Sequence, residues 1–418
     1  MHIESLIKAA LRDALSSILT SEIEIPIELE FTSDLKHGDY TSNIAMKVMR
    51  IVAEANKSHV NAPNFTWHRF NSSNPRDLAE YLKEHVDKKI EGMEKVEIAG
   101  PGFINFYLAD SVFAAMLENV THNPDSWGRN DLHKGEKIMI EYTDPNPFKE
   151  FHIGHLMSNA IGESIARLCE FSNAEVKRAN YQGDVGPHVA KAIWGVQKLG
   201  VDPHDAASLG KAYTAGATAY ESDEAAKAEI DAINVQVYDR KNETINEIYA
   251  TGRKASLEHF EEIYKILGTK FDRYFFESET APRGLKLVHA HEDIFEKSDG
   301  AIVYKGEQDG LHTRVFITSR GTPTYETKDL GLLELKQEQG ALDTSITVTA
   351  HEQADYFKVM IAAAKHVPEV RDIASKTKHV THGMMRFAEG KMSSRTGNVI
   401  TGESLLGDVA EVAKERAA

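Results

Sequence analysis

The sequence predicts an α/β protein in which a smaller α/β domain precedes a doubly wound parallel nucleotide-binding sheet of the Rossmann type. The first observation behind this prediction is a strand, a helix and a second strand within about forty-five residues, 137–181. Such a βαβ unit is the basic element of a parallel nucleotide-binding sheet. The second observation is the length of 418 residues, which allows two or three domains that each bury a core.

Hydrophobic patterns define the elements of the βαβ unit. KIMIEY (137–142) is a short apolar run of strand length, and EVKRANY (175–181) is the next strand. Between them a helix is expected to begin near His155 and to end at Asn173. Its apolar residues have the spacing of a buried helix face: Met157, Ala160, Ile161, Ser164, Ile165 and Leu168.

Residues 1–110 are expected to form the smaller domain. Its first 19 residues have apolar side chains at helical spacing interrupted by charges, which is typical of an amphipathic helix. IEIPIELE (23–30) alternates like a strand, and AMKVMRIVAEA (45–55) is helical. VEIAGPGFINFYL (96–108) contains two strand-like runs separated by Gly and Pro.

A connector is expected over 111–136, because turn-forming residues gather in THNPDSWGRN (121–130). Residues 137–418 are then expected to form the larger domain, with a mostly helical insertion at about 195–267. Three later stretches have the pattern of strands, the last of them as part of the parallel sheet: AIVYKG (301–306), HTRVFIT (312–318) and SITVTAH (345–351).

Composition and charge narrow the class of protein. Lys and Arg number 48 and Asp and Glu 64, a formal net charge of −16, which does not favour binding of nucleic acid by overall charge. Six basic residues against two acidic ones do gather over 371–395, as a solvated loop or a phosphate site. Cys169 is the only cysteine, which excludes an internal disulfide. No signal peptide and no apolar run of ~18 residues is found, so a cytoplasmic enzyme is expected.

The first motif with chemical potential is His152-Ile153-Gly154-His155, between the first strand and its crossover helix. At this point of a doubly wound sheet, a helix N-terminus offers free N–H groups and a positive dipole end to phosphates. Gly154 permits close approach of a nucleotide, and two imidazoles can donate hydrogen bonds to phosphate oxygens. Half of a zinc site is the alternative, but one cysteine and no HExxH pattern make it the weaker interpretation.

The second motif is Lys391-Met392-Ser393-Ser394-Arg395, about 240 residues downstream in the basic segment. A flexible lysine followed by hydroxyls and an arginine suits a loop that grips a leaving pyrophosphate. Alone, such a loop is more often only solvated. The two motifs in this order and at this spacing are far more specific than either one.

The sequence resembles a known family at these motifs. HIGH and a KMSKS-like pentapeptide mark the class I aminoacyl-tRNA synthetases, and the surrounding sequence is most similar to arginyl-tRNA synthetases. The similar segments are HGDYTSNIAM (37–46), GPGFINFYL (100–108), EYTDPNPFKEFHIGH (141–155) and GKMSSRTGNVI (390–400). The resemblance covers nearly the whole chain. It implies a Rossmann-like catalytic domain of the HIGH superfamily behind an N-terminal domain that contacts tRNA.

An arginine pocket can also be argued from charge. A guanidinium is always charged and favours carboxylates in a planar, bidentate arrangement. Glu141 ends the first strand, and Tyr325 and Asp329 share one face if residues 322–330 are helical. Each carboxylate alone would more often be an ordinary surface or helix-terminal group. The resemblance is therefore needed to favour the pocket.

The resemblance implies roles for named residues. Tyr325, Asp329 and Glu141 are expected to hold the guanidinium, and Asn146 and Gln353 to orient the α-amino group. The residues expected to bind ATP are His152, Gly154, His155, Lys391, Ser393 and Ser394. The expected catalytic residues are His152 and His155, which stabilise charge at the α-phosphate, and Lys391 and Arg395, which hold pyrophosphate. No metal-binding residue is expected.

The implied activity is that of an arginine–tRNA ligase. The carboxylate of L-arginine attacks the α-phosphorus of ATP, giving arginyl-adenylate and pyrophosphate, and the 3′ end of tRNA(Arg) then takes the arginyl group. Positioning and charge stabilisation suffice, so no covalent enzyme intermediate is needed. Mg²⁺ is expected to accompany ATP. No tightly bound cofactor, DNA or membrane partner is expected, and the chain is expected to be a monomer.

Some features depart from the family pattern or stay open. About twenty-three residues follow the second motif, where family members have a helical anticodon-binding domain, so the chain is expected to lack that domain. Val185 stands where Trp is common in the Gly-Asp-x-Gly motif of 183–186, and Thr396 where Lys often follows. Lys149 is either a phosphate ligand or an exposed lysine, and His351 either meets adenine or ends a strand.

Two other activities are weighed against this one. Another HIGH-superfamily enzyme, such as a small-molecule nucleotidyltransferase, would usually be shorter and lack both the N-terminal domain and the Tyr325/Asp329 pair. A non-catalytic tRNA-binding or regulatory synthetase paralogue would usually have lost motif residues, whereas both histidines and Lys391 are present here. The arginine–tRNA ligase is therefore favoured.

Overall fold

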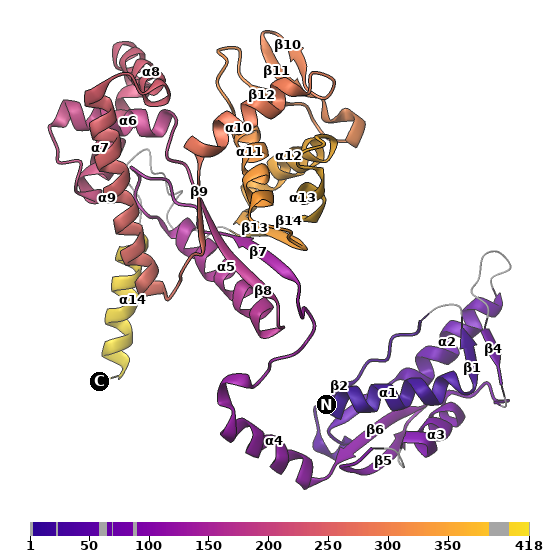
Figure 1. Ribbon diagram of the computed structural model, residues 1–418. Coiled ribbons are helices and arrows are strands. Elements are labelled where there is room, and N and C mark those ends of the chain that lie inside the picture. Colours follow the sequence, from indigo (N-terminus) through magenta and orange to yellow (C-terminus); the bar gives the residue numbers. More distant parts are fainter. Residues whose placement is uncertain are drawn as a thin grey trace. The chain divides into compact units, whose positions relative to one another are not determined.

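The computed structural model describes residues 3–21, 24–57, 65–68, 70–86, 90–383 and 401–417. The chain folds into two compact units, Met1–Trp127 and Gly128–Ala418 (Figure 1). No helix within the described ranges is long and apolar enough to cross a membrane.

The first unit contains one four-stranded antiparallel sheet and several helices. The strands, in sheet order, are β2 (Glu30–Phe31), β3 (Tyr40–Ser42), β6 (Phe103–Leu108) and β5 (Met93–Ala99). The helices are α1 (Ile3–Ser16), α2 (Ile44–Lys57), α3 (Pro75–Val86) and α4 (Asp110–His122). A separate antiparallel pair consists of β1 (Leu19–Ser21) and β4 (Phe65–Trp67).

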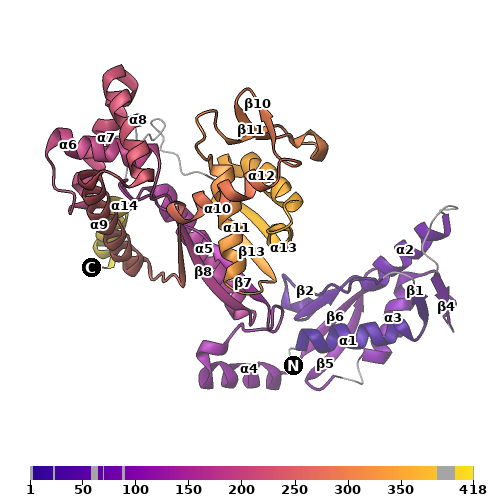
Figure 2. The same ribbon diagram turned by 45° about the horizontal axis from the view of Figure 1, so that its top comes forward.

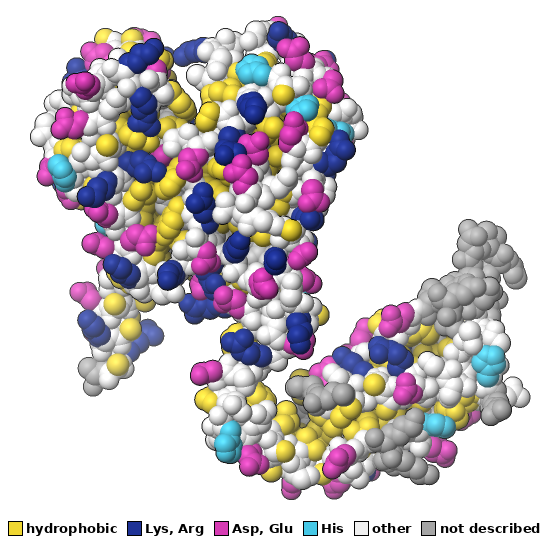
Figure 3. Space-filling view, in the orientation of Figure 1, with side chains coloured by type: hydrophobic (Ala, Val, Ile, Leu, Met, Phe, Trp, Pro, Cys, Tyr) yellow, Lys and Arg dark blue, Asp and Glu magenta, His cyan; other side chains and the backbone are white. Residues whose placement is uncertain are grey.

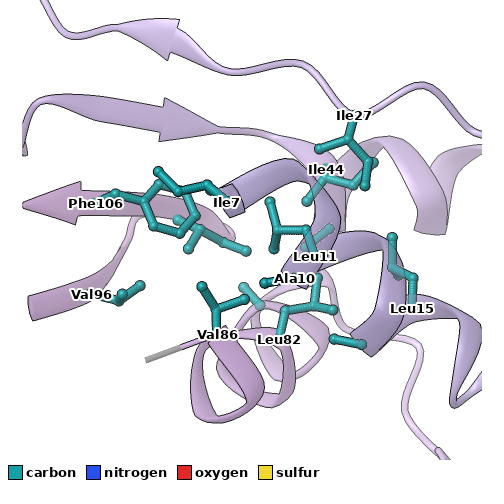
Figure 4. Packing of buried hydrophobic residues seen from close by; sticks show 14 of the residues in the cluster. Ile7, Ala10, Leu11, Leu15, Ile27, Ile44, Leu82, Val86, Val96 and Phe106 are labelled. Carbon is teal, nitrogen blue, oxygen red and sulfur yellow. The ribbon is translucent and has the colours of Figure 1, made fainter. Parts of the chain in front are cut away.

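The core of this unit confirms the amphipathic helix that the first residues predict. α1 buries Ile7 and Leu11 completely, and Figure 4 shows them packed with Leu82 of α3 and Phe106 of β6. Burial of each such side chain contributes about 1.5–3 kcal/mol to folding. The helix predicted at 45–55 and the two strands predicted within 96–108 are confirmed as α2, β5 and β6.

The strand predicted at Ile23–Glu30 is wrong for the described residues 24–29, which are irregular, and only Glu30 enters a strand. Pro26 lies in the middle of this segment, and proline lacks the N–H that a sheet ladder requires. The alternating pattern still has a structural basis, because Ile27 is buried in the core of the unit. The alternation of apolar and polar residues thus did not distinguish a hydrogen-bonded strand from an irregular segment that packs against the core.

The second unit is built on a five-stranded, all-parallel sheet with helices around it, as the fold class predicts. The strand order is β14 (Thr377–His382), β13 (Thr344–Ala350), β7 (Lys137–Glu141), β8 (Glu175–Gln182) and β9 (Arg273–Phe276). The βαβ unit is confirmed as β7, α5 (Ile153–Phe171) and β8. β13 confirms the late strand predicted at 345–351.

Two groups of elements flank the carboxyl ends of these strands (Figures 1 and 2). One group contains α6 (Pro187–Leu199), α7 (Ala206–Ser222), α8 (Glu224–Asp239) and α9 (Glu243–Leu267). The other contains α10 (Glu277–Ala290), α11 (Tyr325–Glu338), α12 (Ala354–His366) and α13 (Arg371–Lys376). Figure 3 shows that the surface is hollowed between the two groups. α14 (Gly402–Ala417) is the last described helix.

The strands predicted at 301–306 and 312–318 form outside the parallel sheet. They are β11 (Ala301–Tyr304) and β12 (Arg314–Ile317), which pair antiparallel and, with β10 (Glu296–Ser298), make a separate three-stranded sheet. Short strands joined by a few residues pair with one another, whereas parallel strands need a crossover of a dozen or more residues. The elements therefore exist as predicted, in an antiparallel sheet of their own.

Candidate active site

A cavity of about 590 Å³ opens at the carboxyl end of the parallel sheet, where β7 and β13 are neighbours. From β7 the chain crosses to β8 on one side, whereas β13 lies on the other side, so strand order reverses at this point. Such a switch point leaves a crevice in which ligands of open α/β sheets bind. Residues from the ends of β7, β8, β13 and β14 line the cavity, including Glu141, Tyr181, Ala350 and His382.

The backbone between β7 and α5 is held in an unusual conformation. Thr143, Asp144 and Phe148 have positive φ values of 81°, 47° and 68°. Residues other than Gly rarely adopt this backbone conformation. Hydrogen bonds fix the loop: the Thr143 N–H donates to Ser158 Oγ (3.1 Å), and the Phe148 N–H to Ser256 Oγ (2.9 Å). The surrounding structure therefore over-determines this loop, which carries several of the cavity residues.

His152 and His155 form the start of α5. The helix was predicted to begin near His155, but it begins at Ile153 and His152 is its N-cap. The reason is reciprocal capping: His152 Nδ1 accepts from the Gly154 N–H (3.1 Å), and His155 Nδ1 accepts from the His152 N–H (3.2 Å). A β-carbon on Gly154 would lie 2.9 Å from the His152 ring, so this position favours Gly.

Both imidazoles are neutral and share one tautomer. Burial, with help from the nearby Lys149 ammonium, lowers the pKa of His152 to about 4. Burial, and then the neighbouring His152, lowers the pKa of His155 well below its ordinary value. Because each Nδ1 accepts a hydrogen bond, the single ring proton is on Nε2 in both residues. Each ring therefore keeps an N–H donor for a ligand at the helix N-terminus.

Three carboxyl groups, Glu141, Asp144 and Asp329, line the cavity, and one of them is paired with a buried lysine. Glu141, the last residue of β7, is 2% exposed, and its Oε2 is 2.9 Å from Lys336 Nζ. Burial, followed by repulsion from Glu141, raises the pKa of Asp144 well above its ordinary value. Burial raises the pKa of Asp329 to about 8, against the opposing effect of a hydrogen bond from the Tyr356 hydroxyl. An added cation would relieve this accumulation of acidic groups.

The remaining predicted residues come from three different elements. Asn146 follows the turn after β7, and its Oδ1 occupies the place where a β-carbon of Gly183 would stand. Tyr325 is the first residue of α11, one turn before Asp329, and it is 66% exposed. Gln353 ends the short 3₁₀ turn that follows β13. Tyr325 and Asp329 were expected to share one face if residues 322–330 are helical. The helix α11 begins at Tyr325 and therefore includes both residues.

The predicted site residues fall into three sets. Those that line the cavity are Glu141, Asn146, His152, Gly154, His155, Tyr325, Asp329 and Gln353. Those outside the described residues are Lys391, Ser393, Ser394 and Arg395. The open candidates Lys149 and His351 are not among the residues lining the cavity.

Polar residues beyond the predicted ones also line the cavity, among them Asp144, Tyr181, Glu277, Tyr356 and His382. Asp144, Tyr181 and His382 lie at or just after the carboxyl ends of parallel strands, which is a signal that could have identified them. Glu277 follows β9, a strand that was not predicted, and its carboxylate is 2.5 Å from the buried Lys328 ammonium. No local pattern indicates Tyr356, whose partner Asp329 lies on another helix.

The Gly-Asp-x-Gly motif of 183–186 connects elements of the unit. Asp184 is completely buried and accepts hydrogen bonds from the Ser278 N–H (2.8 Å), Ser278 Oγ (2.8 Å), Tyr249 Oη (3.1 Å) and Arg253 Nε (2.9 Å). It thereby joins the start of α10 to α9. Val185 is buried in the core formed with α6 and α7. Asp184 is thus a structural carboxylate behind the cavity.

Two family models match the chain. Residues 117–418 match the model described as tRNA synthetases class I (R), catalytic domain. Residues 1–108 match the model described as the arginyl tRNA synthetase N terminal domain. Together the two models account for nearly the whole chain.

Curated relatives and solved structures agree with these models. The chain is 30% identical to the arginine–tRNA ligase of Shouchella clausii, covering 95% of this chain and 69% of that protein. It is 29% identical to that of Treponema denticola, covering 85% of this chain and 62% of that protein. The arginyl-tRNA synthetase structures of Plasmodium falciparum and Thermus thermophilus share its fold, with TM-scores of 0.69 and 0.68 at 18% and 19% identity. These structures match 99% of this chain, and it matches 68% and 70% of theirs.

The chain thus spans between 62% and 70% of the length of these relatives. Its two matched regions occur in the same order as the two units of the fold, the N-terminal model within the first unit and the catalytic model over the second. On this evidence, the chain belongs to the class I arginyl-tRNA synthetase family.

Proposed function

We propose that this chain activates L-arginine with ATP and transfers it to the 3′ end of tRNA(Arg). The observation that carries the proposal is that one cavity is lined both by carboxyl groups and by hydrogen-bond donors at a helix N-terminus. Glu141, Asp144 and Asp329 contribute acidic groups to its lining, and two neutral imidazoles at a helix N-terminus contribute hydrogen-bond donors. The first set suits a guanidinium and the second suits phosphates, so both small substrates find complementary groups.

In this proposal Glu141, Asp329 and Tyr325 hold the arginine side chain. Two carboxylates can each accept from the planar guanidinium, whose charge is permanent and does not depend on pH near neutrality. Asp329 has its other oxygen occupied by the Tyr356 hydroxyl, which fixes the direction of its carboxylate. Asn146 and Gln353 orient the α-amino group, and the backbone at Gly183 leaves room for the Asn146 amide.

On the nucleotide side, His152 and His155 donate from Nε2 to oxygens of the α-phosphate, and Gly154 allows the phosphates to approach the start of α5. The neutral state of both rings supports this role, because a donor without charge is not drawn into an ion pair with the acidic residues. Lys391, Ser393, Ser394 and Arg395 would hold the β- and γ-phosphates and the leaving pyrophosphate. Mg²⁺ would arrive with ATP as part of the substrate.

The proposed reaction has two displacements. A carboxylate oxygen of arginine bonds to the α-phosphorus as the bond to the bridging oxygen breaks, so pyrophosphate leaves and arginyl-adenylate forms. A ribose hydroxyl of the tRNA terminus then attacks the arginyl carbonyl, loses its proton and releases AMP. Positioning and charge stabilisation account for both steps, so no enzyme nucleophile is required.

The remaining assignments are proposed at the level of domains. The family model of the first unit supports contact of residues 1–110 with tRNA, joined through the segment 111–136 to the catalytic residues 137–418 with their helical insertion at about 195–267. The cavity that we propose as the activating centre is lined by residues of the second unit. A monomeric state and a cytoplasmic location stay predictions.

Calorimetric binding of a non-hydrolysable arginyl-adenylate analogue tests the proposal. Lysyl and glutamyl analogues serve as controls for charge and shape, and a citrullyl analogue replaces the guanidinium by a neutral group of the same outline. The variants are Asp329→Ala and, as a matched surface carboxylate, Asp372→Ala of α13, which pairs with the half-buried Lys376 one turn away. Binding of the arginyl compound alone, lost in Asp329→Ala and retained in Asp372→Ala, is expected. Equal or absent binding across the set would refute the arginine assignment.

A further inference from the structure

Lys336 is a buried cation that does not line the cavity. It lies on α11, two turns after Asp329, and is 1% exposed. Its Nζ is 2.9 Å from Glu141 Oε2, 3.3 Å from Thr347 Oγ1 and 3.5 Å from Ser345 Oγ. Lysine is almost never buried to this degree unless it is paired. Glu141 is its carboxylate partner, and the two hydroxyl groups complete its polar surroundings.

The strand register explains why these groups meet. Thr347 of β13 is the partner of Glu141 of β7 in the parallel pairing, and Ser345 is two residues earlier on the same strand. Residues paired across two strands, and residues two apart on one strand, project from the same face of a sheet. Lys336 therefore reaches that face from α11 at the junction of β7 and β13, where the cavity opens.

The ion pair gives the two carboxylate oxygens of Glu141 different surroundings. Oε2 is buried and lies within ion-pair distance of the ammonium, in a direction that does not make a hydrogen bond. The other oxygen, Oε1, is thus the one left for a ligand, since Glu141 lines the cavity. A buried ion pair to one oxygen restricts rotation of the carboxylate and so favours one direction for the other oxygen, as paired recognition of a guanidinium requires.

We propose that Lys336 is a positioning residue for arginine recognition, which orients the Glu141 carboxylate without touching the substrate itself. This inference rests on the proposed function, because it assumes that Glu141 receives the guanidinium. A different expectation follows if Lys336 only supplies positive charge. It would then oppose a cationic ligand, and its removal would tighten arginine binding. Positioning predicts the reverse.

A double-mutant cycle separates these cases. The full chain is titrated calorimetrically with the arginyl-adenylate analogue as wild type, Lys336→Met, Glu141→Gln and the double variant. Lys336→Met is expected to weaken binding about tenfold or more in the wild-type background and less than about threefold in the Glu141→Gln background. Lys336→Arg keeps the charge and is expected to retain most of the affinity. Lys365→Met, an exposed lysine on α12, is the matched control and is expected to bind as wild type does.

Each outcome bears on one claim. If wild type does not bind the arginyl analogue, the proposed function fails and not the positioning role. If wild type binds but Lys336→Met binds equally well or more tightly, or loses the same factor in both backgrounds, the positioning role is overturned. If circular dichroism shows Lys336→Met unfolded, recovery of the fold on adding Glu141→Gln would support the pairing, because neither partner then leaves the other unpaired. Failure of that rescue would overturn it.

Discussion

The rings of His152 and His155 stack with centroids 3.7 Å apart and planes 15° from parallel. Two charged imidazoles would repel at this distance, and both pKa values are indeed lowered, that of His152 to about 4. The stack therefore presents two neutral Nε2–H donors on one side of a helix N-terminus. A ligand with several anionic oxygens is the natural partner of such an arrangement.

The first prediction separates the two nitrogens of His155. The amide of Asn can replace Nδ1 as an acceptor for the His152 N–H, whereas the longer Gln places its amide near Nε2. His155→Asn is expected to keep the start of α5 intact and to slow adenylate formation by ~10²-fold, because the donor to the phosphate is lost. His155→Gln is expected to retain more activity. Pyrophosphate exchange, with tRNA present, measures the rates. Equal loss in both variants would contradict a role for Nε2–H.

The second prediction concerns Gly183. A β-carbon there would collide with Asn146 Oδ1 and lie 3.3 Å from the Glu277 carboxyl group. Gly183→Ala is therefore expected to displace the Asn146 amide and to weaken binding of the arginyl-adenylate analogue about tenfold, with a loss of stability of about 1–3 kcal/mol. Gly407→Ala on α14, where nothing lies within 4 Å of the added carbon, is the control and is expected to bind normally. Unchanged affinity in Gly183→Ala would show that the position of Asn146 does not matter.

The third prediction tests Asp184 as a structural carboxylate. Replacing it by Asn puts an amide among four donors and leaves Arg253 without its carboxylate partner. Asp184→Asn is expected to lower the free energy of unfolding of the second unit by ~3–5 kcal/mol. Asp372→Asn removes only a surface pair and is expected to change it by less than about 0.5 kcal/mol. Denaturant unfolding measures both. A stable Asp184→Asn that binds no substrate analogue would instead assign Asp184 to the site.

Local sequence pattern predicts three strands of the parallel sheet and the part of the site that follows β7, because a strand end and the helix start after it are close in both sequence and space. Glu141, Asn146 and His152 come from one such strand–helix connection. Asp329 and Gln353 lie about 180 and about 200 residues further along the chain than His152, and they were placed in the site only through resemblance to a family.

Contacts that cross the fold were not predictable in this way. Ser158 Oγ donates to the Val348 carbonyl across 190 residues, and Lys336 reaches Glu141 from a helix whose own pattern shows no reason for a buried lysine. β9 and β14 are short strands at the two edges of the sheet, and only the pairing with β8 and β13 defines them. Such features depend on tertiary packing, which overrides local preference.

The fourth prediction follows from the raised pKa of Asp329. Its unfolded pKa is near 3.8 and its folded pKa is about 8, so as pH rises between these values the unfolded chain loses a proton that the folded chain keeps. The wild type therefore loses stability over this window, and the effect levels off above pH 8. Asp329→Asn lacks this term, so its stability relative to wild type is expected to increase from pH 4 to pH 8, by at most ~1.4 kcal/mol per pH unit. Thermal melts across this range test it. A constant difference would mean that Asp329 titrates normally.

The fifth prediction is that binding of the arginyl-adenylate analogue releases a proton. Near pH 7 the unliganded site holds a proton on Asp329, whose pKa is about 8, and Asp144 adds to this because its pKa is also raised. A guanidinium stays protonated throughout this pH range, so its positive charge lowers the pKa of these carboxyl groups when it binds. The affinity for the analogue is therefore expected to increase with pH up to about 8, by at most about tenfold per pH unit, and to be constant above that pH.

Calorimetry in phosphate and in Tris at the same pH measures the released protons, since the two buffers differ in their enthalpy of protonation. The observed enthalpy is expected to differ between the buffers at pH 7 and to converge above pH 9, where Asp329 is ionised before the ligand arrives. Glu141→Gln is the informative variant. Glu141 contributes repulsion that raises the pKa of Asp329, so its loss is expected to reduce proton release at pH 7 in whatever binding remains. Identical enthalpies in both buffers at pH 7 would mean that Asp329 and Asp144 are already ionised in the unliganded protein, and would contradict the prediction.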